Sequence, residues 1–399
     1  MIADDSTLET EQETSVDLSD CRVLVVDDTP SGRQLMSALL GAAGVRTIEF
    51  ARDGAEGLAE IEKGVPDLVI FDIAMPDMDG AEFCRRLRAD ERLRQLPLLA
   101  VTARDGAADR SAIFRAGATD FITTPIHGAE LIARVRSHLE NRLLIRSLQE
   151  HVKLMQWELE LARYMQENLL PRPETLRTIA ATTGLSVSSH FQPSSELGGD
   201  LWAVHPFGDG RTGVSIVDFA GHGLAAALNT FRLHALMSEI LPDPADPAGF
   251  LTLLNEGLVE LLPSGQFATM FFAVIDSRQG VLTFAAAGSP KPVVANHDVS
   301  FLDSSGLPLG ITTEARYENR KVPFPEGSVL LLYSDALTES ADRSGHCLGL
   351  PDLAAMVAAG RQRDSGAPMG PLLSRFLMTH APIVDDLTVL WLRQGPLPL

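Results

Sequence analysis

Four aspartates in the second half of the chain each lie beside turn residues at the end of an apolar, strand-like run. They are Asp200, Asp218, Asp335 and Asp385. Carboxylates this far apart in sequence can converge only if the strands that carry them lie side by side. An all-oxygen site of this kind suits Mg²⁺ or Mn²⁺ better than Zn²⁺, and two such ions can generate a hydroxide and hold a phosphoryl group. The alternative is that each aspartate only caps a turn.

These segments resemble the metal-dependent protein phosphatases (protein phosphatase 2C-like), in the SpoIIE-type bacterial branch that includes sporulation stage II and sigma-regulator serine phosphatases. A lone Gly-Gly-Asp would be a weak signal, but further segments follow in family order. They are residues 158–166, 169–171, 191–193, 268–276, 306–310 and 385–388. The resemblance implies an α+β phosphatase domain over residues 172–395, built as a β-sandwich flanked by helices.

The resemblance also implies a role for each aspartate. Asp218 matches the carboxylate that bridges two Mg²⁺ or Mn²⁺ ions, and Phe219 would offer its backbone carbonyl to one of them. Asp200, Asp335 and Asp385 match the ligands that each bind one ion. A water held between two divalent charges has a lowered pKa and can supply a nucleophile near neutral pH.

Three positions depart from the family pattern. Ala336 replaces a Gly, so a backbone with positive φ there would be strained by the alanine Cβ. Ser289 replaces a His, and Ala203 replaces a frequent Asp. We expect His222, which follows the bridging aspartate, to have a structural role rather than to bind metal. The departures keep open an alternative function, a pseudo-phosphatase that binds its partner without turnover.

The first third of the chain contains two short apolar runs that end in carboxylates. Asp27 and Asp28 follow the first run, and Asp72 ends the second. Strand-like and helical stretches alternate here, which predicts a parallel sheet of βα units. Function in such sheets gathers at the carboxyl ends of the strands. The helical stretches are residues 33–43, 55–62, 82–88 and 109–116.

This segment, residues 21–140, resembles a two-component receiver domain, which implies a doubly wound, flavodoxin-like α/β fold. By that resemblance Asp72 is the phosphoacceptor and one Mg²⁺ is bound. The implied ligands of that ion are Asp27, Asp28, Asp72 and the carbonyl of Ala74.

The same resemblance implies that Thr102 and Phe121 are the switch residues of the receiver. The family's Lys is missing, because Thr124 stands at its position and cannot supply a cation to the phosphoryl group. Arg104 could compensate in part, although a solvated arginine on a loop is the simpler interpretation.

Residues 141–171 predict a helical linker with a heptad seam of roughly three and a half heptads. We expect it to pair two chains as a coiled coil, with Gln166 fixing the register. The alternative is an amphipathic helix that packs on its own domain. The seam comprises Ile145, Leu148, Val152, Met155, Leu159, Ala162, Gln166 and Leu169.

Composition indicates a cytoplasmic protein. The three cysteines are scattered, which argues against disulfides and zinc. The acidic N-terminus lacks a signal core, residues 1–20 are expected to be a disordered tail, and no run reaches membrane-spanning length. A net charge of −20 disfavours nucleic acid and anionic membranes as partners.

Together these features predict a response regulator whose output is a Mg²⁺- or Mn²⁺-dependent protein serine/threonine phosphatase. The resemblance implies a cognate sensor histidine kinase as phosphodonor. It also implies a phosphorylated STAS-type anti-anti-sigma protein as substrate, in a partner-switching pathway. A homodimer through the linker helix is expected.

Overall fold

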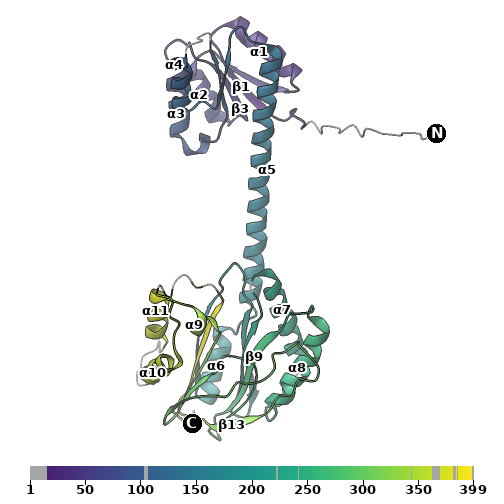
Figure 1. Cartoon of the computed structure of the whole chain (residues 1–399), viewed down its shortest axis with the longest axis vertical. Coiled ribbons are helices and arrows are strands. Elements are labelled where there is room, and N and C mark those ends of the chain that lie inside the picture. The colour runs from purple at the N-terminus through teal and green to yellow at the C-terminus, as the bar shows by residue number, and fades with distance from the viewer. Residues whose placement is uncertain are drawn as a thin grey trace, which may run out of the picture. The chain divides into compact units, whose positions relative to one another are not determined.

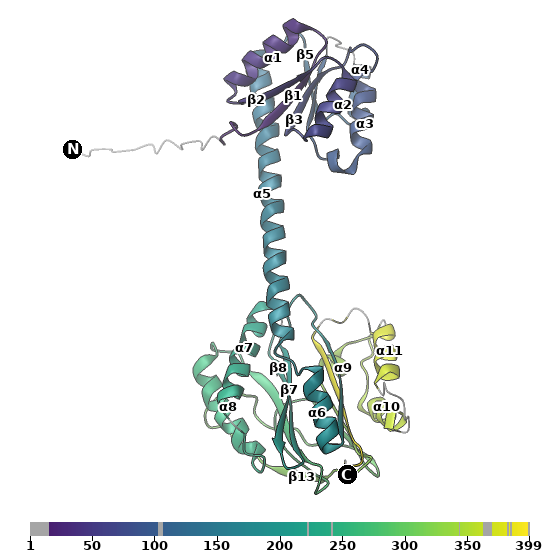
Figure 2. The same cartoon turned by 180° about the vertical axis from the view of Figure 1, so that it is seen from behind.

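The structure is a computed structural model that describes residues 16–102, 107–221, 223–240, 242–342, 344–361, 369–380, 383 and 385–397. It divides into two compact units, Met1–Leu154 and Met155–Leu399, and each is described by itself (Figures 1 and 2). Helix α5 (Gly128–Glu167) has residues in both units.

The first unit contains a five-stranded parallel sheet with the strand order β2-β1-β3-β4-β5. Three of its helices follow residues whose side chains accept a hydrogen bond from the backbone N–H three positions on: Thr29, Asp53 and Asp79. The elements are β1 (Arg22–Val26), α1 (Pro30–Ala42), β2 (Thr47–Ala51), α2 (Gly54–Lys63), β3 (Leu68–Asp72), α3 (Gly80–Ala89), β4 (Leu98–Thr102), α4 (Ala107–Ala116) and β5 (Asp120–Thr123).

Helices cover both faces of this sheet because alternate residues of its strands point to opposite faces. Val23 and Val25 of β1 pack in one cluster with residues of α1 and α5. Leu24 and Val26 pack in another cluster with residues of α2, α3 and α4. This doubly wound arrangement confirms the fold predicted for the first third of the chain.

The second unit contains two five-stranded antiparallel sheets, β13-β10-β9-β8-β7 and β12-β11-β14-β15-β6. The strands are β6 (Leu185–Gln192), β7 (Asp200–Gly208), β8 (Arg211–Phe219), β9 (Ala268–Asp276), β10 (Val281–Ala287), β11 (Val293–Ala295), β12 (Val299–Phe301), β13 (Arg320–Pro323), β14 (Val329–Tyr333) and β15 (Leu387–Gln394). The helices are α6 (Pro173–Thr183), α7 (Leu224–Glu239), α8 (Pro247–Leu261), α9 (Ala336–Glu339), α10 (Leu350–Arg361) and α11 (Gly370–Thr379).

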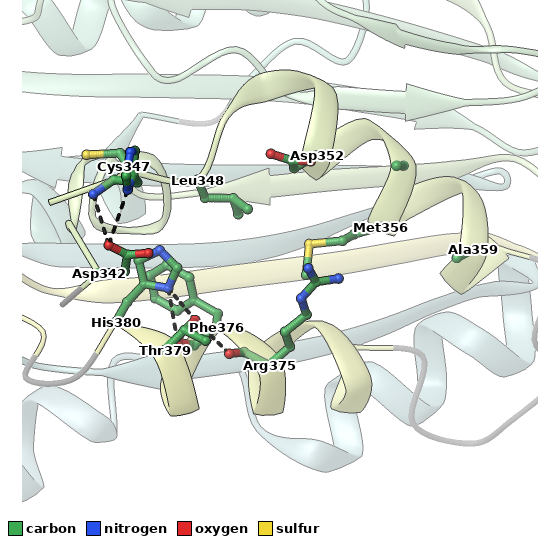
Figure 3. Close-up of a pocket in the computed structure, with 12 residues that line it drawn as sticks. Asp342, Cys347, Leu348, Asp352, Met356, Ala359, Arg375, Phe376, Thr379 and His380 are labelled. Carbon is green, nitrogen blue, oxygen red and sulfur yellow. Dashed lines mark hydrogen bonds and ion pairs between the residues drawn. The ribbon is translucent and has the colours of Figure 1, made fainter. Parts of the chain in front are cut away.

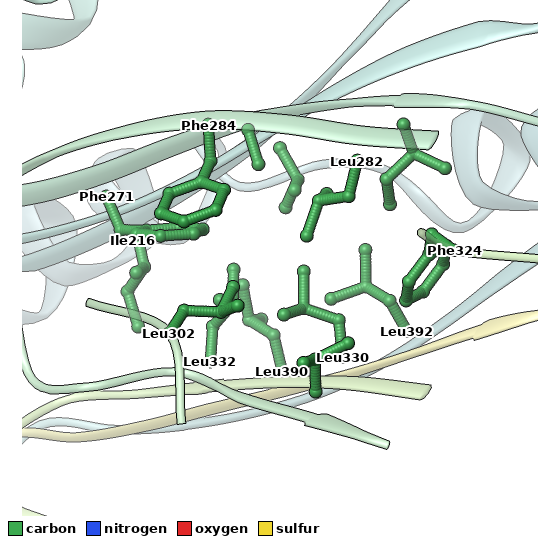
Figure 4. Close-up of a cluster of buried hydrophobic side chains, with 14 of the residues drawn as sticks. Ile216, Phe271, Leu282, Phe284, Leu302, Phe324, Leu330, Leu332, Leu390 and Leu392 are labelled. Atoms are coloured by element: carbon green, nitrogen blue, oxygen red, sulfur yellow. The ribbon is translucent and has the colours of Figure 1, made fainter. Parts of the chain in front are cut away.

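The main core of this unit lies between the two sheets. Phe271 and Phe284 of the first sheet pack in one buried cluster with Leu332 and Leu390 of the second (Figure 4). Truncating a fully buried leucine in such a cluster to alanine typically costs roughly 2–5 kcal/mol. Contact between the two sheets therefore contributes substantially to the stability of the unit.

Helices cover the outer faces of both sheets. Residues of α7 and α8 pack on the first sheet, and residues of α9, α10 and α11 pack on the second. Figure 1 shows α7 and α8 on one side of the strands and α10 and α11 on the other. The expected β-sandwich flanked by helices is thus confirmed.

Two further observations concern the whole chain. All three cysteines are free, and Cys21 and Cys84 are buried. Within the described residues, no helix has the length and apolar character needed to cross a membrane.

Candidate functional site

Two of the four predicted aspartates face each other across neighbouring strands. Asp200 is the first residue of β7 and pairs directly with Asp218, near the end of β8. The Asp200 side chain is completely buried, and its Oδ2 accepts a 2.5 Å hydrogen bond from Thr388 Oγ1. Its other oxygen, Oδ1, is buried without a hydrogen-bond partner among the described residues. A buried, unpaired carboxylate oxygen is costly unless a ligand or cation satisfies it.

The other two aspartates lie beside paired strands of the second sheet. Asp335 follows β14, Asp385 precedes β15, and these two strands are neighbours. Ser334 fixes the two chain segments together, because its Oγ donates to the Asp386 carbonyl at 2.7 Å and accepts from the Thr388 N–H at 2.8 Å. Thr388 in turn reaches Asp200, so it connects this edge of the second sheet to the first sheet.

The four aspartates lie close enough together for their charges to interact. Burial, with the negative charges of Asp335 and Asp385 next, raises the pKa of Asp218 to about 8. Burial followed by the charge of Asp385 raises the pKa of Asp335 to about 6. Burial and the charge of Asp218 raise the pKa of Asp200 well above its ordinary value. Among the described residues, none of the ion pairs includes these carboxylates.

The chemistry of this site fits divalent metal ions. All the candidate donors are oxygens, which Mg²⁺ and Mn²⁺ prefer, and the unpaired Oδ1 of Asp200 is a donor in need of a partner. The carboxylates have the chemistry of metal ligands, but their side chains are not arranged as a complete set of ligands. Within the part of the chain that the structure describes, no three His, Cys, Asp or Glu side chains form a group ready to hold an ion.

Asp386, which sequence reasoning did not single out, holds the loop that leads into Asp200. Its Oδ1 accepts from the N–H and the Oγ of Ser194 at 2.7 and 2.9 Å, and its Oδ2 accepts from the Gly199 N–H at 2.5 Å. Asp386 is 2% exposed. The two adjacent aspartates thus differ in environment. The Asp386 carboxylate accepts hydrogen bonds from the loop, whereas Asp385 is only half-buried.

Two expectations about neighbouring residues need correction. Ala336 does not adopt positive φ, because it is the first residue of helix α9, and strain from its Cβ is therefore absent. Gln166 was placed in a seam between chains, but it is 1% exposed and bonded to Gly198 inside the second unit. The heptad spacing continues through the turn of helix that packs into the domain. Spacing alone therefore could not show that Gln166 is buried within its own chain.

Other residues near the site lie as follows. Phe219 is buried, and its N–H donates to the Gly199 carbonyl at 3.3 Å. Ser289 has a buried Oγ without a partner among the described residues. Gly223 is the N-cap residue of α7. His222 lies outside the described residues.

In the first unit, the carboxylates predicted to act together lie at the carboxyl ends of β1 and β3. Burial, followed by the charges of Asp27 and Asp28, raises the pKa of Asp72. The Ala74 N–H donates to Asp72 Oδ1 at 3.0 Å. The Asp27 side chain accepts from the N–H and Oγ1 of Thr29, both at 2.7 Å.

The predicted switch residues lie on the neighbouring strands β4 and β5. Thr102 ends β4 and is 3% exposed. Phe121 of β5 packs edge to face on Phe114 of α4, with ring centroids 5.6 Å apart. Thr124 is exposed, and its N–H donates to the Thr102 carbonyl at 2.8 Å. Arg104 lies outside the described residues.

A separate cavity of about 430 Å³ lies beside α10 and α11 (Figure 3). Its described lining includes Asp342, residues 346–348, Arg375 and His380, and none of the candidate metal ligands. The His380 ring stacks on Phe376 with centroids 4.5 Å apart, and Asp342 accepts from the N–H groups of Ser344 and His346. The side chains of Asp342 and His380 are thus hydrogen-bonded within the protein itself.

Comparison with protein families identifies both parts of the chain. A model for the response regulator receiver domain matches residues 23–136, and a model for stage II sporulation protein E (SpoIIE) matches residues 208–395. Among solved structures, the SiaA-PP2C domain of Pseudomonas aeruginosa is similar, with a TM-score of 0.53 and 22% identity. That match covers 61% of this chain and 98% of the SiaA domain, and it supports the fold of the second unit.

Two curated relatives are response regulators, and each matches about a third of the chain. The response regulator PleD of Caulobacter vibrioides is 40% identical over 129 residues, which is 32% of this chain and 28% of PleD. The response regulator MprA of Mycobacterium ulcerans is 41% identical over 123 residues, which is 31% of this chain and 52% of MprA. The chain therefore spans about half or less of the length of these relatives.

Proposed function

We propose that this chain, which joins a response regulator receiver domain to a SpoIIE-type, PP2C-like phosphatase domain, is a metal-dependent protein serine/threonine phosphatase. The observation that carries the proposal is the cross-strand pair of the buried Asp200 and the half-buried Asp218, with the charges of Asp335 and Asp385 acting on Asp218. With no cation among the described ion pairs, repulsion from the neighbouring carboxylates opposes the ionisation of Asp218, and divalent cations relieve that repulsion.

Each residue of the site has a proposed role in binding metal or in positioning a metal ligand. Asp218 would contact two ions, and Asp200, Asp335 and Asp385 would each contact one, with the Phe219 carbonyl as a further oxygen donor. Bound Mg²⁺ or Mn²⁺ supplies the activated water and neutralises the oxygens of the phosphoryl group. Thr388 and Ser334 hold Asp200 and the Asp385–Asp386 segment in place through the hydrogen bonds described above.

In the receiver, Asp72 would accept a phosphoryl group from a sensor histidine kinase. Asp27, Asp28, Asp72 and the Ala74 carbonyl would hold one Mg²⁺, which neutralises charge as the phosphoryl group arrives. Thr102 and Phe121 would respond to the phosphorylated state.

The proposed substrate is a phosphorylated STAS-type anti-anti-sigma protein in a partner-switching pathway in the cytoplasm. The family resemblance of the phosphatase domain supports this substrate class. The chain would act as a homodimer paired through α5. Ala336 gives less support to the pseudo-phosphatase alternative than expected, because its backbone is helical and unstrained.

The decisive experiment measures phosphate release from phosphorylated STAS proteins encoded near this gene, with Mn²⁺, with Mg²⁺ and with a chelator. We expect metal-dependent turnover by the native chain. Asp218→Asn should lower it by more than about 100-fold, since loss of even an outer partner of a metal ligand typically costs about 10- to 100-fold.

Asp209→Asn is the matched control. Asp209 lies in the turn between β7 and β8, at the far end of the same hairpin, with φ of 52°, which asparagine tolerates. It should retain native turnover. Absence of turnover by the native chain on phosphoproteins and aryl phosphates with every divalent metal would favour the pseudo-phosphatase.

A further inference from the structure

The side chain of Gln166, one residue before the end of α5, binds both backbone groups of Gly198. Its Nε2 donates to the Gly198 carbonyl at 2.6 Å, and its Oε1 accepts from the Gly198 N–H at 3.2 Å. Nε2 also lies 3.3 Å from Thr230 Oγ1 of α7. Because Gln166 is 1% exposed, loss of any of these bonds would leave a buried polar group unsatisfied.

Asp386 lies close to Gly198 and binds the next residue, Gly199. A Cβ added to Gly198 would lie 2.9 Å from Asp386 Oδ2, and the same carboxylate oxygen accepts the Gly199 N–H. Gln166 and Asp386 therefore fix the positions of Gly198 and Gly199, the two residues that immediately precede Asp200. No side chain would fit between Gly198 and Asp386 without a shift.

These contacts also reach Phe219, which lies beside the candidate ligand Asp218. The Gly199 carbonyl accepts from the Phe219 N–H at 3.3 Å. A Cβ added to Gly199 would lie 3.1 Å from the Phe219 carbonyl oxygen, which is one of the proposed metal donors. A displacement of Gly198 would thus move both the Asp200 carboxylate and the surroundings of the Phe219 carbonyl.

We propose that Gln166 is a positioning residue for the metal centre, which it serves by fixing Gly198 and so the positions of Asp200 and Phe219. This inference rests on the proposed function, and it assigns to the end of α5 a role in metal affinity. The competing explanation is that Gln166 is a buried polar residue that contributes only to folding stability.

The chain supplies a control for that explanation. Gln394, at the end of β15, is 2% exposed, and its amide bonds to the Thr183 carbonyl, the Gly395 carbonyl and Ser277 Oγ at 2.9, 3.0 and 2.8 Å. β15 has eight residues, so at about 3.3 Å per residue Gln394 lies roughly 23 Å from the end of the strand next to Asp385. Gln394→Ala removes a similarly bonded amide far from the carboxylates.

The test uses the full chain and titrates it with MnCl₂ in a calorimeter, alongside thermal unfolding in chelator and turnover as a function of Mn²⁺ concentration. Gln166→Ala should weaken Mn²⁺ binding by about 10- to 100-fold, the range for loss of a residue that orients a metal ligand. Saturating Mn²⁺ should restore most of its turnover. Gln394→Ala should lose thermal stability to a similar extent and bind Mn²⁺ as the native chain does.

Gln166→Glu gives a second variant of nearly the same size. It keeps an oxygen that can accept the Gly198 N–H but replaces the donor to the Gly198 carbonyl, so it should also weaken Mn²⁺ binding. The inference is overturned if both Gln166 variants bind Mn²⁺ like the native chain, or if Gln394→Ala weakens binding equally. If the native chain binds no Mn²⁺, the proposed function fails, and this inference fails with it.

Discussion

At the scale of single residues, the environment of Asp218 makes a testable statement about pH. Its folded pKa of about 8 lies far above the value of about 4 expected in the unfolded chain. The metal-free folded state therefore holds more protons than the unfolded state between about pH 4 and pH 8. Stability from this group is greatest below pH 4 and is lost as pH rises to 8, because the half-buried carboxylate, surrounded by other carboxylates, must then carry a charge.

Asp218→Asn should remove this contribution, since asparagine stays neutral. In chelator, the Tm of Asp218→Asn minus the Tm of the native chain should increase steadily from pH 5 to pH 8. Asp209→Asn, at the exposed far end of the hairpin, should show no such trend. A constant difference across that range would mean that Asp218 titrates normally in the folded chain.

Metal binding should follow the opposite trend with pH. Mn²⁺ requires the deprotonated carboxylates, so its affinity for the native chain should rise from pH 6 to pH 8 as Asp335 and then Asp218 lose their protons. Calorimetric titration with MnCl₂ at several pH values measures this directly, and proton release on binding should be largest at the lower pH values. A Kd independent of pH would place the metal away from these residues.

At the scale of elements, local patterns predicted which segments become strands and helices but not all of their contacts. The alternation of short apolar runs and helical stretches was sufficient for the receiver sheet, and the strand-end aspartates were sufficient to predict neighbouring β-strands. Sequence patterns could not show that Asp385 and Asp386 have different roles, because two adjacent carboxylates look the same in the sequence. Only the fold shows that Asp386 holds the 194–199 loop.

Helix α5 illustrates the same limit. Along the predicted seam, Leu148 and Val152 are 66% and 45% exposed, while Leu159 is half-buried. On the opposite face, Leu154 and Trp157 are 53% and 60% exposed. The heptad pattern thus leaves the choice of pairing face open to experiment, because apolar side chains occur on both sides of the helix.

We predict that the pairing face contains Leu148 and Val152. Leu148→Glu with Val152→Glu should convert dimers to monomers in light scattering, since it places like charges across the seam. The matched variant, Leu154→Glu with Trp157→Glu, adds the same charge on the opposite face and should remain dimeric. The reverse result would assign pairing to the opposite face, and dimers in both variants would show that α5 does not pair the chains.

At the scale of the whole molecule, the question is how strongly the receiver controls the phosphatase. The usual receiver lysine pairs with a phosphoryl oxygen, but Thr124 is uncharged, and its Oγ1 lies 3.5 Å from the Thr102 carbonyl. A hydrogen bond to a charged group contributes roughly 1.5–3 kcal/mol. That is comparable to a typical coupling free energy between two sites, roughly 1–3 kcal/mol. We therefore expect loss of the lysine to remove much of the free energy available for switching.

We predict that phosphorylation of Asp72 changes phosphatase turnover only modestly in the native chain. Thr124→Lys should enlarge the response, because it restores at this exposed position the cation that the receiver family uses to pair with the phosphoryl group. Asp72→Ala should leave the basal turnover nearly unchanged. Turnover measured with and without beryllofluoride, in all three proteins, tests this. A strong response in the native chain that is lost in Asp72→Ala would show that another group has replaced the lysine, and Arg104→Ala would then be the first variant to examine.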